Sequence, residues 1–305
     1  MAGLDFRAAP VQVRVPATSA NLGPGFDACG LALTLADTVV ARVSGGGLDV
    51  EVSGEGADSV PTTERHLVVR AMRTAFDVLG GQPRGLAVRC ANHIPHGRGL
   101  GSSAAAIVAG ILAARELVVG GHDHLDDLAV LRLAAATEGH PDNVAACLLG
   151  GYTVAWTAAD GVHALRRDVD PSVVPVAFVP PTRVPTSRAR RLLPTSVPFA
   201  DAALSAGRAA LLTAALTAPA DRELLLAATE DRLHQQYRAA AMPGSAGLVA
   251  RLRSEGVAAV VSGAGPTVLA LTDAAGAAGL AAAAPPGFAT MVLGVDADGA
   301  RVVAG

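Results

Sequence analysis

The sequence contains no lysine, and all 24 basic residues among its 305 are therefore arginine. This absence excludes the Walker A type of phosphate loop, which needs a lysine to reach the terminal phosphates of a nucleotide. A phosphate group bound by this chain must be neutralised by backbone amides, a helix N-terminus, a metal ion or arginine.

Aromatic residues are also scarce: they make up 3% of the chain, although 51% of its residues are hydrophobic. The core must therefore be built from alanine, valine and leucine. The formal net charge is -3, and no basic stretch is interleaved with aromatic residues. Both observations argue against nucleic-acid binding, and we expect no nucleic-acid partner.

Cysteine is rare, and the three present (Cys29, Cys90 and Cys147) lie far apart without the paired spacing of a metal site. We interpret them as small buried residues in a reducing compartment. No stretch approaches the ~20 uncharged apolar residues that span a bilayer. Asp5 and Arg7 stand where a signal peptide needs an apolar run. We expect a cytoplasmic protein without a membrane partner.

Strand-like and helix-like segments are mixed along the whole chain. The glycine-separated segments around residues 45–47 predict a β-hairpin, and residues 85–91 predict a further strand. An alanine- and leucine-rich helix is predicted over 102–118, with Ser102 or Ser103 as its N-cap.

Composition also indicates a domain boundary. Between residues 157 and 175 the hydrophobic pattern loosens and charge rises. We therefore predict two domains, residues 1–165 and 166–305, each mixing helices and strands. This pattern predicts an α+β fold with two lobes and an active site in the cleft between them.

The stretch "HGRGLGSS" joins the strand predicted at 85–91 to the following helix. Its alternating glycines, Gly97, Gly99 and Gly101, admit positive φ and let a ligand approach the backbone. The N–H groups at the start of the helix form an anion site, and Ser102 or Ser103 has an oxygen for phosphate or Mg²⁺. The alternative is an ordinary tight turn with a serine N-cap.

The run from Pro95 to Ala104, P-x-x-x-G-L-G-S-S-A, closely resembles the phosphate loop of the GHMP kinase superfamily. Four further segments resemble the homoserine kinase family within it, a fifth, beginning at residue 262, resembles the third motif of the superfamily, and all five follow one another in the expected order. They are "VPATSANLGPGFDACGLAL" (15–33), "EGHPDNVAACLLGG" (138–151), "TSRARRLLP" (186–194), "DRLHQQYR" (231–238) and "SGAGPTVLAL" (262–271).

The resemblance implies a two-lobed GHMP kinase fold, with ATP and Mg²⁺ as cofactors and L-homoserine as the acceptor. The γ-phosphoryl group of ATP would pass to the side-chain hydroxyl, giving O-phospho-L-homoserine for threonine synthesis. A homodimer is compatible with it. Another GHMP kinase, acting on mevalonate or a sugar, and a non-catalytic nucleotide-binding sensor remain alternatives.

By the same resemblance, one group of residues binds the nucleotide and its metal ion. Ser103 and Glu138 are the expected Mg²⁺ ligands, although Glu138 is otherwise an ordinary residue at a helix end. His66 stands where the family has asparagine near the adenine, and Arg98 either contacts phosphate or points to solvent. The implied nucleotide-binding residues are Pro95, Gly97, Arg98, Gly99, Leu100, Gly101, Ser102, Ser103 and His66.

A second group would hold the acceptor. Asp27 takes the ammonium group and Asn21 other polar atoms, where the ordinary alternative is a pair of turn-capping residues. Arg190 and Arg238 take the carboxylate, for which a guanidinium suits bidentate pairing; otherwise they are solvated helix residues. Thr186 would lie near the transferred phosphate, or simply cap a helix.

By the same resemblance, Asn143 occupies the position at which the mevalonate branch of the superfamily has a carboxylate. In that branch the carboxylate is assigned as the catalytic base. An amide cannot take a proton at neutral pH, although it can orient a hydroxyl group. Phosphoryl transfer depends mainly on positioning and charge neutralisation, so we expect catalysis by Asn143 and Thr186 without a dedicated protein base. Asp142 is the alternative base, and for His140 we expect a structural role or a polar contact.

Overall fold

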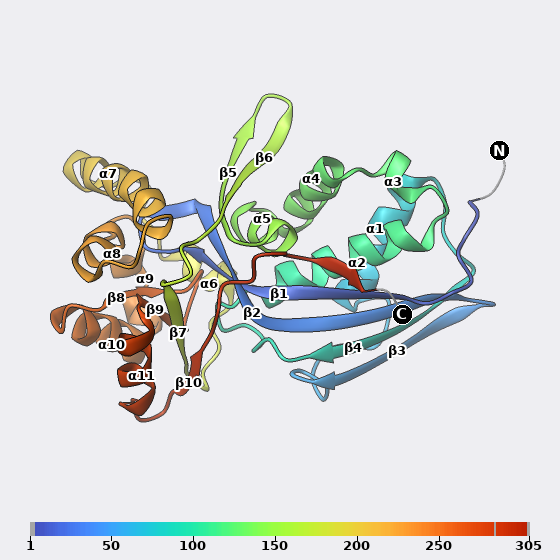
Figure 1. Ribbon diagram of the computed structural model, residues 1–305. Helices are drawn as coiled ribbons and strands as arrows, with labels where there is room; N and C mark the ends of the chain where they lie inside the picture. Colours follow the sequence, from blue (N-terminus) through green and yellow to red (C-terminus); the bar gives the residue numbers. More distant parts are fainter. Residues whose placement is uncertain (1–3, 284, 304–305) are drawn as a thin grey trace.

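The computed structural model describes residues 4–283 and 285–303, which form two β-sheets with helices packed on them (Figure 1). The larger sheet has seven strands in the order β11-β1-β2-β4-β3, with β5 and β6 continuing from β2. Its strands are β1 (Val11–Asn21), β2 (Gly25–Ser44), β3 (Gly47–Gly54), β4 (Gly85–Asn92), β5 (Tyr152–Ala158), β6 (Gly161–Arg167) and β11 (Arg301–Val303).

The predicted hairpin around residues 45–47 is wrong, because β4 lies between β2 and β3. Strand β4 pairs antiparallel with β2 and parallel with β3. Consecutive buried residues such as Leu86, Ala87 and Val88 suit β4 to a central position. Strand β3 instead alternates apolar residues with exposed Asp49 and Glu51, as an edge strand does. The strand predicted at 85–91 is confirmed.

Helices cover one face of the larger sheet (Figure 1). The predicted helix over 102–118 is confirmed as α2, which is buried for most of its length. Its N-cap is Gly101, with φ 71°, so the predicted serine N-cap is wrong: Ser102 is already helical. The helices of this layer are α1 (Leu67–Leu79), α2 (Ser102–Leu117), α3 (Gly121–His124), α4 (Asp127–Glu138) and α5 (Asp142–Leu149).

The second sheet has four antiparallel strands in the order β10-β7-β9-β8. They are β7 (Val174–Val179), β8 (Ala258–Val261), β9 (Val268–Thr272) and β10 (Ala289–Val292). The helical segments of this half are α6 (Thr186–Arg191), α7 (Phe199–Leu216), α8 (Arg222–Ala228), α9 (Gln235–Arg238), the 3₁₀ turn η1 (Ala239–Ala241), α10 (Pro243–Ser254) and α11 (Ala274–Ala282). The α+β fold class is confirmed.

One helix of the described chain, α7, is long and apolar enough by length and composition to cross a membrane, with a mean hydropathy of 1.2 over 18 residues. It nevertheless carries Asp201 and Arg208, which pair with Arg232 and Glu230. These ion pairs attach α7 to the segment that precedes α9.

The chain passes from the first sheet to the second between β6 and β7, near the predicted domain boundary at residue 165. After β10 it returns, and β11 pairs with β1 in the larger sheet (Figure 1). Asp296 anchors this return: its carboxylate accepts hydrogen bonds from the Arg14 guanidinium at 2.6 Å and the Gly299 N–H at 2.9 Å. The domain limits themselves stay a prediction.

We expect Asp296→Ala to lower the free energy of unfolding by about 2–3 kcal/mol, because it leaves a buried N–H and the Arg14 guanidinium without their acceptor. Urea unfolding followed by circular dichroism measures the loss. Asp298→Ala is the matched control, since that exposed carboxylate pairs only with Arg301 on the same segment. Equal destabilisation by both variants would contradict the anchoring role.

Candidate active site

Seven segments from both halves of the chain meet around one cavity of about 150 Å³. The contributing segments are the β1–β2 turn, the loop before α2, the end of α4, the start of α5, α6, α9 and the turn between β8 and β9. The predicted acceptor-binding residues all line this cavity: Asn21, Asp27, Asn143, Thr186, Arg190 and Arg238. The predicted phosphate and metal residues Gly97, Gly99, Gly101, Ser102, Ser103 and Glu138 line it too.

The glycines of the loop before α2 are required by close packing. A Cβ atom on Gly101 would overlap the hydroxyl oxygen of Thr18, and one on Gly99 would overlap the carbonyl oxygen of Ser262. The Ser262 hydroxyl also donates to the Gly99 carbonyl at 2.6 Å. The loop is therefore held between β1 and the 262–265 turn, and the first residues of the 16-residue helix α2, Ser102 and Ser103, line the cavity.

Three predicted nucleotide residues take other positions. Pro95 and Leu100 are buried and line neither this cavity nor the adjoining one described below. Arg98 neither points freely into solvent nor lines the cavity: its side chain is 18% exposed and lies 3.7 Å from Glu55. It also donates to the carbonyl of Pro181 at 3.4 Å. Nucleotide contacts by these three residues stay predictions.

A second cavity of about 210 Å³ adjoins the first, and Ser102 and Ser103 line both. Its wall is largely apolar and includes His66, which is only 5% exposed. Among the described residues, nothing forms a hydrogen bond to Nδ1 of His66. Burial, and then the nearby His96, lower the pKa of His66, so its imidazole is neutral at pH 7 and has a free polar atom.

Ser103, in the first turn of α2, contacts Glu138 at the end of α4, and the serine hydroxyl donates to the glutamate carboxylate. Burial raises the pKa of Glu138, while the hydrogen bond from Ser103 opposes that shift. The described residues contain no cluster of three or more His, Cys, Asp or Glu side chains that suits a metal ion. Two hard oxygen donors beside an anion site fit Mg²⁺, which takes few protein ligands and completes its shell with phosphate oxygens and water.

The β1–β2 turn holds residues in the left-handed region: φ is 68° at Asn21, 48° at Leu22 and 55° at Asp27. The Asn21 side chain stabilises this turn, because its Oδ1 accepts from the Asp27 N–H at 3.0 Å and its Nδ2 donates to the Gly263 carbonyl at 2.9 Å. The amide of Asn21 is thus engaged by the protein backbone. Its predicted substrate contact stays a prediction.

Asp27 and Arg190 form a two-point ion pair across the cavity, with distances of 2.7 and 3.0 Å. Each side chain is 36% exposed. The ion pair raises the pKa of Arg190, since the carboxylate stabilises the charged guanidinium. The two residues predicted to bind opposite ends of an amino acid therefore satisfy each other in this structure.

Arg238 is buried, with only 2% of its surface exposed, and among the described residues no carboxylate forms an ion pair with it. Burial, and next the charge of Arg190, lower its pKa. The ring of Phe26 lies 5.3 Å from the Arg238 guanidinium and 5.8 Å from that of Arg190. Phe26 was not among the predicted site residues, although an aromatic in "GPGFD" of such an aromatic-poor chain was a usable signal.

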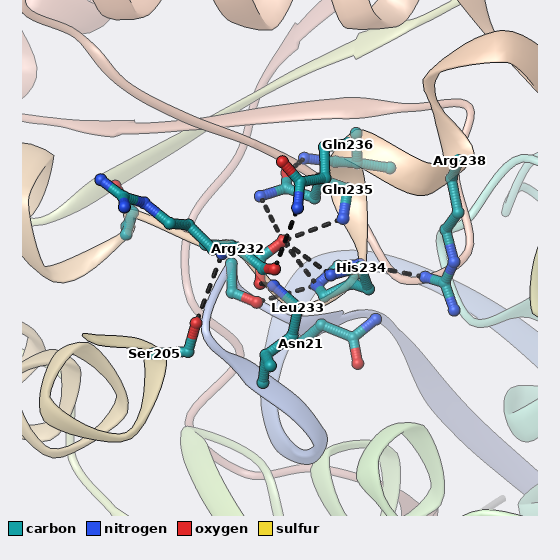
Figure 2. A network of polar contacts seen from close by, with 12 residues as sticks. Asn21, Ser205, Arg232, Leu233, His234, Gln235, Gln236 and Arg238 are labelled. Carbon is teal, nitrogen blue, oxygen red and sulfur yellow. Dashed lines mark hydrogen bonds and ion pairs between the residues drawn. The ribbon is translucent and has the colours of Figure 1, made fainter. Parts of the chain in front are cut away.

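Figure 2 shows His234 between Arg238 and the turn that contains Asn21. Its Nδ1 lies 3.2 Å from a guanidinium nitrogen of Arg238, which can only donate, so Nδ1 accepts. Its Nε2–H then donates to the Gly23 carbonyl at 2.8 Å. Asp231 fixes the segment by accepting from the N–H groups of Leu233 and His234 at 2.7 and 3.2 Å.

The start of α5 brings Asp142, Asn143 and His140 together. Asp142 is 2% exposed, and its Oδ1 accepts from His140 Nδ1 at 2.8 Å and from the Asn143 N–H at 2.7 Å. The hydrogen bond that His140 donates to Asp142 raises the pKa of His140. On the other side, the Thr18 hydroxyl donates to Asn143 Oδ1 at 2.7 Å. Thr18 also lay outside the predicted site residues.

Comparison with known protein families places these features in a class. The family of GHMP kinase N-terminal domains matches residues 66–151, and that of GHMP kinase C-terminal domains matches residues 202–286. The fold and the glycine-serine loop at the helix N-terminus thus define a GHMP kinase.

Individual relatives narrow the class. The chain is 61% identical to a homoserine kinase of Streptomyces avermitilis over 99% of both chains. A solved homoserine kinase of Cytophaga hutchinsonii superposes with a TM-score of 0.84 at 26% identity, covering 99% of this chain and 100% of that one. The structure of a putative homoserine kinase of Listeria monocytogenes superposes with a TM-score of 0.76 at 31% identity. This match covers 97% of the present chain and 99% of the Listeria chain. The chain belongs to the homoserine kinase family.

The buried imidazole of His234 makes stability depend on pH. Burial lowers its pKa below the ordinary value of 6.5. The unfolded chain then takes up the proton first, so the contribution of His234 is complete above the ordinary value and is lost as the pH falls below it. We expect the melting temperature to fall from pH 7.5 to 5.5, and to fall less in His234→Asn, which keeps an acceptor without titrating.

Thermal unfolding at both pH values checks this expectation. The exposed His124 serves as the control, and His124→Asn should retain the full pH dependence of the parent protein. An unchanged dependence in His234→Asn would contradict the assignment.

Proposed function

We propose that the protein transfers the γ-phosphoryl group of ATP to the side-chain hydroxyl of L-homoserine, giving O-phospho-L-homoserine for threonine synthesis. The observation that carries this proposal is Arg238, a buried guanidinium in the cavity wall without a carboxylate partner among the described residues. A buried charge without a counter-ion is costly. An acceptor that brings a carboxylate removes that cost, whereas a sugar or a simple alcohol does not.

The ion pair between Asp27 and Arg190 supports an amino-acid acceptor. An α-amino acid carries one ammonium and one carboxylate, so it can exchange with the pair at no net change of charge. Its carboxylate would lie between Arg190 and Arg238, and its ammonium group at Asp27. The ring of Phe26 supports both guanidinium groups on the same side of the cavity.

The remaining wall of the cavity would contact the acceptor's hydroxyl group and the phosphates of ATP. Asn143 and Thr186 line the same cavity as the glycine-serine loop, where the N-terminus of α2 attracts the phosphates. The adjoining apolar cavity with His66 would take the nucleotide base, and the neutral imidazole offers a hydrogen-bonding atom there. Ser103 and Glu138 would hold Mg²⁺, which supplies positive charge for the phosphate oxygens when bound.

We also propose that no protein side chain acts as a dedicated base. Each carboxylate in the cavity already has a partner: Asp27 pairs with Arg190, Glu138 accepts from Ser103, and Asp142 accepts from His140. The raised pKa of His140 favours its protonated form, which cannot take a proton. Positioning and charge neutralisation then provide the acceleration, as a loose phosphoryl-transfer transition state allows.

The cytoplasmic location, the homodimer and the two-domain division at residue 165 belong to the same proposal. They rest on the family resemblance and on composition.

ADP release in the presence of Mg²⁺-ATP tests the acceptor. We expect turnover with L-homoserine, and at least about 100-fold lower kcat/KM with 4-hydroxybutyrate or 3-aminopropan-1-ol, because each lacks one charged end and leaves a charged group of the cavity without its partner. Mevalonate, galactose and serine complete the panel. Turnover with only an acceptor that is not an amino acid would overturn the proposal.

The same assay, run on a variant of Arg238, tests whether this arginine binds the acceptor. Arg238→Gln should raise KM for L-homoserine strongly while KM for ATP stays close to that of the parent protein. An equal rise in both constants would indicate general damage to the site.

The role of Asn143 is tested by comparing Asn143→Ala with Asp142→Asn. Without a dedicated base, we expect the Asn143 variant to lose kcat at least as much as the Asp142 variant, by about 10-fold to 100-fold. Steady-state kinetics across pH provide the measurement. A far larger loss in Asp142→Asn, with a displaced acidic limb of the kcat profile, would make Asp142 the base.

A further inference from the structure

Thr18 connects the nucleotide side of the active site with the acceptor side. It lies in β1, fully buried. Its backbone N–H donates to the Leu100 carbonyl in the phosphate loop at 3.1 Å. Its hydroxyl donates to Asn143 Oδ1 at the start of α5 at 2.7 Å. One residue of β1 therefore contacts both the nucleotide side and the acceptor side.

The neighbours of Asn143 determine which way its amide faces. The carboxylate oxygen Oδ1 of Asp142 lies 3.4 Å from the nitrogen Nδ2 and accepts from it. A carboxylate has only acceptor atoms, so an amide oxygen in that place would be repelled. The other end of the amide, Oδ1, then faces Thr18, whose hydroxyl must donate. Two contacts from opposite sides fix a single orientation.

This orientation decides what Asn143 offers to a bound molecule. Its Oδ1 is engaged by Thr18, and one hydrogen of Nδ2 is directed to Asp142. The second hydrogen of Nδ2 is the side-chain donor that Asn143 can still present to the cavity it lines. An N–H donor stabilises an oxygen that carries negative charge during group transfer.

We infer that Thr18 is a positioning residue that holds Asn143 as a hydrogen-bond donor toward the reacting oxygen atoms. The inference rests on the proposed kinase function and concerns how that site works. It also accounts for the glycine N-cap of α2, because a Cβ on Gly101 would overlap the Thr18 hydroxyl. The phosphate loop and the amide of Asn143 are thereby built around the same hydroxyl group.

The test removes the hydroxyl group while keeping the shape of the side chain. We expect Thr18→Val to lower kcat for L-homoserine about 10-fold, because the Asn143 amide loses its fixed orientation, with KM for either substrate changed by less than about 3-fold. Thr18→Ser keeps the hydroxyl and should recover most of kcat. Thr153→Val is the matched control: within the described part of the chain this buried threonine donates only to the Gly30 carbonyl, at 3.4 Å, and its variant should keep kcat.

A double-mutant cycle separates positioning from general packing. In the Asn143→Ala background, Thr18→Val should cost less than about 2-fold in kcat, since there is no amide left to orient. Full additivity of the two losses would overturn the inference, as would a Thr18→Val variant with unchanged kcat or a Thr18→Ser variant without recovery. If Thr18→Val fails to fold by circular dichroism, the smaller Thr18→Ala variant replaces it in the same cycle.

Activity of the parent protein distinguishes failure of the inference about Thr18 from failure of the proposed function. Homoserine-dependent ADP release by the parent, together with an unaffected Thr18→Val variant, rejects the inference and leaves the proposed function standing. Absence of homoserine-dependent release in the parent rejects the proposed function, and the cycle is then run with whichever acceptor of the panel is active.

Discussion

The turn between β1 and β2 is the constraint on which the active site depends. It holds Asn21 and Asp27 in left-handed backbone conformations, which cost free energy unless surrounding contacts stabilise them. Those contacts come from the other half of the chain: Gly263 accepts from Asn21, and His234 donates to Gly23. The turn therefore adopts its shape only where both halves meet, and the acceptor site forms at the same place.

Charge compensation is the second organising principle. The cavity contains carboxylates and guanidinium groups that are partly or fully buried, and burial makes an unpaired charge expensive. Most of them satisfy one another, as Asp27 does with Arg190. Arg238 is the exception, and its environment of His234, Phe26 and a backbone carbonyl stabilises it without neutralising it. An unneutralised arginine beside an exchangeable ion pair is an arrangement suited to a zwitterion.

The phosphate side relies on backbone rather than on side-chain charge. Glycines at positions 99 and 101 permit contacts with Ser262 and Thr18 that any side chain would block. The helix that follows provides N–H groups and a partial positive charge, so the absence of lysine is no obstacle. The same close packing links the loop to the amide of Asn143.

The sequence by itself determined the segments that carry the chemistry. The glycine-serine loop, Asp27, Arg190 and Arg238 stand in recognisable local patterns, and the strand at 85–91 and the helix after it follow from their apolar composition and the glycine-rich turn between them. Tertiary structure alone decided the rest. The place of β4 between β2 and β3 depends on long-range pairing, and the roles of Thr18, Phe26 and His234 depend on neighbours more than 100 residues away or across the cavity. Such contacts leave no periodicity in the sequence, because burial and hydrogen bonding are decided in space.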